Sequence, residues 1–160
     1  MRRGFTLVEL LVAIAIIGIL ASLVAIAAAP ALRKSRDAKR QQAVALLGRF
    51  LAGGNCFVPA AGSGDYDLGE LAAEIQGRYP QAASLSWPHD PRGGTDQATG
   101  YRYAVSADAS LCAVYANLED TRAAVTIKDA AGPGLAHGSG VVRGTADGRN
   151  GTDLFFQVSN

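Results

Sequence analysis

A single carboxylate, Glu9, lies inside an apolar segment near the amino end of this 160-residue chain. Residues 5–20 are all apolar or glycine except Thr6 and Glu9. A charge in such a segment is costly unless it is paired, and it usually has a function. Glu9 is therefore the first candidate for chemistry. The simpler alternative is a carboxylate near water that the dipole of a helix amino terminus stabilises.

Two cysteines, Cys56 and Cys112, are the next candidates. In an exported domain they would meet oxidising conditions, which favour a disulfide. The bridge would close a loop of about 55 residues and stabilise the fold by roughly 4 kcal/mol in the chain-entropy model. The alternative is a pair of buried free thiols.

The two histidines give little support to catalysis. His89 lies in the turn-like sequence PHDP, and a catalytic histidine needs a nucleophile and an orienting acid beside it. An exported enzyme is thus the weakest functional hypothesis. A cleft with His89 or His137 beside an acid would revive it.

The late segment GTADGRNGTD contains oxygen donors that suit calcium, namely Asp147, Asn150 and Asp153. However, the EF-hand pattern is absent, and turn formation explains the same composition. The glycine-rich GPGLAHGSG lacks the Lys-Ser/Thr of a phosphate loop. We therefore expect no metal site, no cofactor and no catalytic residue.

Charge is unevenly distributed along the chain. Residues 33–40, RKSRDAKR, hold five bases and one acid, a net charge of +4, whereas residues 41–160 hold eight bases and twelve acids, a net charge of −4. The basic stretch is either a solvated helix face or a surface that attracts the acidic part of other copies. The overall charge of +1 gives no indication about nucleic acid. The basic stretch could bind it, but we do not expect this partner, because the stretch should be covered by the rest of the protein or by other copies.

The elements that position these residues begin with an apolar run. Residues 10–29 contain no charge, and twenty apolar residues are long enough to cross the bilayer as a helix. Small residues in IAAAPA (26–31) leave ordinary signal cleavage open as an alternative, which would release a soluble domain.

The stretch RRGFTLVELLVAIAIIGILASLVA resembles the class III signal of type IV pilins and type II secretion pseudopilins. It has a short basic leader, Gly4, Phe5, and Glu9 as the fifth residue after the glycine, followed by a long apolar helix. The resemblance is strong over residues 1–30 and loose beyond them. A later pattern, in which a Pro-x-Asp-Pro-x-Gly turn precedes Tyr101 and Tyr103, also looks like pseudopilin heads.

This resemblance implies processing and assembly. A prepilin peptidase would cut between Gly4 and Phe5 and methylate the new amine of Phe5. Glu9 would then meet the amine of a neighbouring subunit during growth of a filament on an inner-membrane assembly platform. The partners would be further copies of the chain and other pilins or pseudopilins. The protein would lie in the cytoplasmic membrane before assembly, and in a cell-surface filament or periplasmic pseudopilus afterwards.

The expected fold is α+β and pilin-like, with a long amino-terminal helix packed on a small antiparallel sheet. The expected organisation is a leader (1–4), a membrane and assembly helix (5–30), an amphipathic outer half (31–53) and a globular head (54–160). Gly18 and Pro30 are weak points in the helix, where it could melt or kink.

In the head, Asp67 and Glu70 have the spacing of a capping box, which predicts a short second helix from residue 68. Strands are expected at GYRYAVS, LCAVYANL, AAVTIK, GVVR and LFFQVS, with SADAS as a hairpin turn. WPHDPRGGTDQATG reads as a loop.

The resulting functional hypothesis is a structural, non-enzymatic subunit of a type IV pilus or pseudopilus. The alternative is a membrane-anchored extracytoplasmic binding domain that never polymerises.

Overall fold

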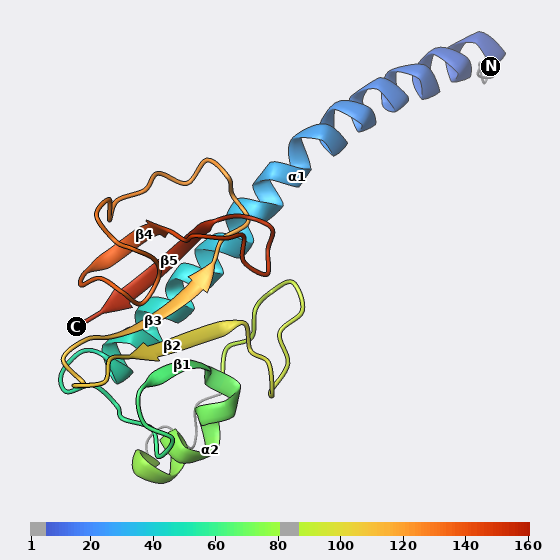
Figure 1. Cartoon of the computed structure of the whole chain (residues 1–160). Helices are drawn as coiled ribbons and strands as arrows, with labels where there is room; N and C mark the ends of the chain where they lie inside the picture. Colours follow the sequence, from blue (N-terminus) through green and yellow to red (C-terminus); the bar gives the residue numbers. More distant parts are fainter. Residues whose placement is uncertain (1–5, 81–86) are drawn as a thin grey trace. The chain divides into compact units, whose positions relative to one another are not determined.

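The computed structural model describes residues 6–80 and 87–160, so the expected leader and Phe5 lie outside the described part (Figure 1). The chain forms two compact units, Met1–Arg33 and Lys34–Asn160. The long helix α1 (Leu7–Leu51) belongs to both, and the second unit adds a five-stranded sheet and a short helix. The expected α+β fold is confirmed.

Helix α1 is continuous over 45 residues. Glu9 in its first turn and Arg49 in its last turn suit the helix dipole. Gly18 and Pro30 are both helical here. Local melting between them during assembly stays a prediction.

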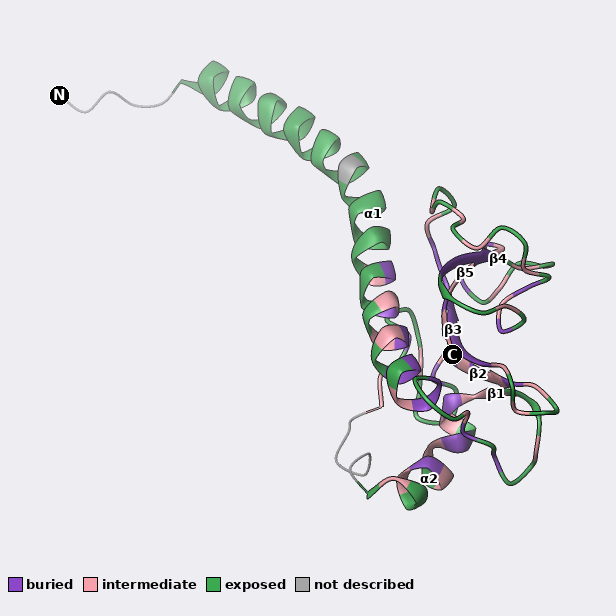
Figure 2. Ribbon diagram, turned by 90° about the vertical axis from the view of Figure 1, so that its left-hand side faces the viewer, coloured by how far each residue is buried: buried purple, intermediate pink, exposed green. Residues whose placement is uncertain are grey.

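The part of α1 from residue 34 onward is amphipathic. Val44, Leu47 and Leu51 form a buried stripe, whereas Leu46 is 59% exposed. Gly48 permits a close approach, since a Cβ there would lie 2.6 Å from Val158 Cβ. Figure 2 shows this buried side of the helix turned toward the sheet.

The strands are β1 (Gly64–Asp67), β2 (Tyr101–Val105), β3 (Cys112–Asn117), β4 (Ser139–Arg143) and β5 (Leu154–Ser159). Their order is β1-β2-β3-β5-β4, and every pairing is antiparallel. The carboxyl-terminal strand β5 thus lies between β3 and β4. The alternate residues Tyr101, Tyr103 and Val105 are buried in the core they share with α1, as their spacing predicts.

Two strand predictions differ from the structure. Strand β1 was not expected, because GDYD lacks the β-branched residues typical of strands. AAVTIK (123–128) is not a strand, although it forms an isolated parallel bridge from Ile127 to Val142, and Ala123 and Val125 pack against the sheet. The N–H groups of Thr126 and Ile127 both donate to Val141 O, so the segment crosses the edge of β4 instead of running along it.

Helix α2 (Leu68–Arg78) forms where the spacing predicts it. Asp67 is its N-cap, but its carboxylate accepts the N–H of Gly69 at 2.9 Å rather than that of Glu70. The same carboxylate also accepts the N–H and the hydroxyl of Thr99, so the cap fixes the loop before β2 as well.

Candidate functional site

The first half of α1 exposes large apolar side chains all around the helix. An 18-residue window has a mean hydropathy of 3.0 and is 0% buried, so the helix is long and apolar enough to cross a membrane. An apolar surface of this size marks a membrane or protein contact. The exposed residues are Leu7, Val8, Leu10, Leu11, Val12, Ile14, Ile16, Ile17, Ile19, Leu20, Leu23, Val24 and Ile26.

Glu9 is held by Thr6 at the start of this helix. Glu9 Oε2 accepts the N–H and the hydroxyl of Thr6, each at 2.9 Å, and the Glu9 N–H donates to Thr6 Oγ at 3.2 Å. These reciprocal bonds form a capping box. Sequence reasoning considered the helix dipole but missed Thr6, although the pattern Thr-x-x-Glu was present.

The capping box gives Glu9 a defined position without a second chain. Its side chain is exposed, so a cation could still approach the carboxylate. The expected cleavage and methylation positions, Gly4 and Phe5, lie outside the described residues. The geometry of the Phe5 amine relative to Glu9 therefore stays a prediction.

The second feature is a buried ionic cluster that joins α1 to the head. Arg40 is completely buried and contacts three carboxylates. Its Nε and Nη2 donate to Asp90 at 2.6 and 2.9 Å. Its Nη1 lies 2.7 Å from both Asp37 Oδ1 and Glu119 Oε1. A charge this deeply buried is tolerated only with such complete pairing.

Arg36 and Asp37 extend the cluster. Arg36 makes a two-pronged contact with Glu119, at 2.8 and 2.5 Å. The Asp37 carboxylate accepts the N–H groups of Glu119 and Asp120, which follow β3. Two of the five bases of the basic stretch, Arg36 and Arg40, therefore form ion pairs within the chain. The stretch is thus neither entirely a solvated helix face nor entirely a surface for other copies.

The pKa shifts follow from this pairing. The hydrogen bond from Arg36, strengthened by Arg40, lowers the pKa of Glu119 to about 2 although burial opposes the change. Burial alone would raise the pKa of Asp90, but the bonds from Arg40 and the Arg92 N–H lower it. Glu119 and Asp90 therefore stay ionised over the physiological pH range.

The three residues weighed as calcium donors have different surroundings. Asn150 is buried, and its amide donates to Asp90 Oδ2 and Asn117 O. Asp153 pairs with Arg143, and Asp147 is exposed. Asn150 thus belongs to the network around the Arg40 cluster and serves the fold.

Cys56 and Cys112 are joined by a disulfide, with their Cα atoms 5.7 Å apart. The bridge connects the segment after α1 to the first residue of β3. Both thiols are used in this bridge, so neither cysteine is a free nucleophile in this state.

His89 does lie beside an acid, with Nε2 2.9 Å from Asp96 Oδ1. The pair sits in an exposed turn, where the Asp96 side chain is 92% exposed. His137 Nδ1 instead contacts Asn160 O. The condition that would revive an enzyme, a cleft enclosing such a pair, is not met by these exposed positions.

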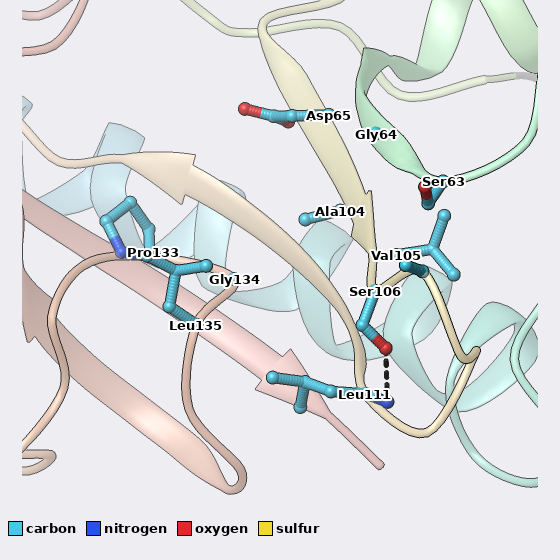
Figure 3. Close-up of a pocket in the computed structure, with 11 residues that line it drawn as sticks. Ser63, Gly64, Asp65, Ala104, Val105, Ser106, Leu111, Pro133, Gly134 and Leu135 are labelled. Atoms are coloured by element: carbon cyan, nitrogen blue, oxygen red, sulfur yellow. Dashed lines mark hydrogen bonds between the residues drawn. The ribbon is translucent and has the colours of Figure 1, made fainter.

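The head also has a hollow of about 480 Å³ beside β1 and β2 (Figure 3). It is lined by residues 63–65, 104–107, 111 and 133–135. Asp65 is the sole carboxylate among these lining residues, and it is already bound by Arg102 and by the Tyr115 hydroxyl. The hollow therefore offers little polar chemistry for recognising a ligand.

Residues 1–28 match the prokaryotic N-terminal methylation motif. This confirms the type IV pilin-like class III signal, and it suggests a structural, non-enzymatic protein anchored in a membrane. No curated protein and no solved structure matches the chain.

Proposed function

We propose that the chain is the precursor of a structural subunit of a type IV pilus or a type II secretion pseudopilus. It is inserted in the cytoplasmic membrane, cut between Gly4 and Phe5 by a prepilin peptidase, methylated at Phe5, and polymerised through α1. Adhesion, motility, DNA uptake and secretion are all roles that such a filament can serve.

One observation carries the proposal, namely that the methylation motif leads directly into an exposed apolar helix that cleavage would leave on the mature chain. In the membrane, lipid covers this surface. In a filament, the same surface packs against helices of other copies, where van der Waals contacts and lipid release favour association.

In this proposal, Glu9 fixes the axial position of each subunit relative to its neighbour in the filament. Removal of the leader creates a cationic amine at Phe5, and a chain-terminal amine ordinarily titrates with a pKa of about 7.7–8. A carboxylate in a dry filament core gains most by pairing with such a cation. The Thr6 capping box orients Glu9 before the partner arrives, because it fixes the side chain against the first turn.

The test compares Glu9→Ala with Thr6→Val in the full-length chain. Thr6→Val removes the hydroxyl of the box but keeps the carboxylate and the Thr6 N–H, so it is the matched control for helix capping. We expect Glu9→Ala to abolish sheared surface filaments while export and leader removal continue. Thr6→Val should cost only the capping contribution of about 0.5–2 kcal/mol and still assemble.

Normal filaments from Glu9→Ala would contradict the role of Glu9. A wild-type chain that is exported and processed but never found in multimers would contradict the filament itself. That second result would favour a membrane-anchored binding domain, the alternative function.

A further inference from the structure

The outer face of α1 in the head unit carries a basic stripe with an apolar centre. Lys39, Gln42, Leu46 and Arg49 recur at helical spacing and are all exposed. Leu46 is 59% exposed. We call these four residues the outer stripe.

The outer stripe differs from the other charges of α1. Arg36, Asp37 and Arg40 are occupied by the ionic cluster, and no exposed acid lies on this part of the helix, which the structure describes in full. The stripe thus presents one cation on each side of a leucine, Lys39 before Leu46 and Arg49 after it. An unpartnered face of this kind calls for an acidic partner that has a shallow apolar centre.

Helix α2 presents that chemistry on the same chain. Glu70 is exposed, and Glu74, one turn later, is half-buried with one carboxylate oxygen accepting the Ala60 N–H at 2.9 Å. The small residues Ala73 and Gly77 lie beside them on the exposed side. Among residues 6–80 and 87–160, nothing lies within 4 Å of a Cβ built at Gly77. Arg78, the cation of this helix, donates to Val58 O and lies over the Phe57 ring instead of pairing with these carboxylates.

We propose that the outer stripe of one copy docks on the exposed face of α2 of a second copy. Leu46 packs on Ala73 and Gly77, while Lys39 and Arg49 reach the carboxylates of Glu70 and Glu74. This inference rests on the proposed function, and it names a contact between heads that the filament would use.

Charge and surface type favour α2 over the other exposed acids. Asp96, Asp108 and Asp129 are single carboxylates on loops, whereas α2 places two on a regular face beside small residues. The two surfaces are different patches of one chain, so the contact is heterologous. Heterologous contacts repeat from copy to copy and generate open helical assemblies rather than closed pairs.

The first test is charge exchange in the full-length chain. The Lys39→Glu/Arg49→Glu variant should lower the yield of sheared filaments by at least about 10-fold, since like charges across an interface cost several kcal/mol. Glu70→Lys/Glu74→Lys should do the same. The chain with all four changes restores complementarity and should recover most of the yield.

The second test is a site-specific cross-link. Leu46→Cys and Ala73→Cys in one chain should give a ladder of multimers under mild oxidation, while the native Cys56–Cys112 bridge remains closed. Leu46→Cys with Ala107→Cys is the matched control, because Ala107 is equally exposed but lies in the turn after β2. Membrane level and protease resistance check that each variant folds.

The outcomes separate this contact from the proposed function. Normal filaments from either charge variant, or filaments without the Leu46–Ala73 cross-link, would overturn the docking and leave the filament standing. A processed wild-type chain that gives neither filaments nor the cross-link would overturn both.

Discussion

Arg40 and Asp90 are fifty residues apart in the sequence and are joined by two hydrogen bonds, Nε–Oδ2 at 2.6 Å and Nη2–Oδ1 at 2.9 Å. Both side chains are buried. The pair ties α1 to the loop that leads into β2, and Glu119 ties the same arginine to the end of β3. Head and helix therefore share one ionic centre in addition to their apolar contact.

Removal of one partner should destabilise the head strongly. Arg40→Met leaves three carboxylates close together without their central cation, and we expect a loss of about 3–5 kcal/mol in the free energy of unfolding. Denaturation in detergent, followed by the fluorescence of the single tryptophan, Trp87, measures it. Arg122→Met, at an exposed position, is the control. A loss under about 1 kcal/mol would mean that the cluster is dispensable.

Glu119 should give the head a specific acid sensitivity. Its folded pKa of about 2 lies below its unfolded value of roughly 4.3. The stabilisation is therefore fully present above about pH 4.3 and is lost as the pH falls toward 2. The difference in unfolding free energy between wild type and Glu119→Gln should shrink over that window. Asp129→Asn is the control, and a pH-independent difference would contradict this account.

The disulfide should contribute about 4 kcal/mol, because it closes a loop with a sequence separation of 56 residues. Replacement of both Cys56 and Cys112 by serine should lower the denaturation midpoint. A reducing agent should lower the wild-type midpoint in the same way and leave the variant unchanged. If the reducing agent leaves the denaturation midpoint of the wild type unchanged, the bridge does not stabilise the head.

Gly48 should be intolerant of even a methyl group. Alanine in a helix gains up to about 1 kcal/mol over glycine. Here, however, the added Cβ would lie 2.6 Å from Val158 Cβ, and overpacking costs about 1–3 kcal/mol. We expect net destabilisation of Gly48→Ala, relieved by adding Val158→Gly, which removes both the Cβ and the Cγ1 that the new methyl group would meet. A stabilised Gly48→Ala would show that β5 moves away at little cost.

Local patterns predicted most of the fold. The apolar run, the Asp67 cap and the alternation of Tyr101, Tyr103 and Val105 each carry their own signal, and each element formed where expected. Strand β1 and the segment 123–128 were predicted wrongly, because pairing in the folded sheet overrides local strand propensity, which is low in GDYD and high in AAVTIK.

Of the candidate site, one part could also be predicted from the sequence and another part could not. Glu9 was visible in the sequence because a lone carboxylate in an apolar run is unusual. The Arg40 cluster was not, since it combines positions 37, 40, 90 and 119, which only the folded chain brings together. The turn containing Asp90 was noticed, but nothing local to it indicates a buried arginine as its partner.

The most direct test of the proposed function is the intact mass and amino-terminal sequence of the protein from sheared surface filaments and from membranes. The account predicts a chain that begins at a methylated Phe5 and is present in filaments or in a membrane-attached pseudopilus. A protein that retains Met1, or one that begins after Ala29, would contradict processing at Gly4 and with it the proposed assembly through α1.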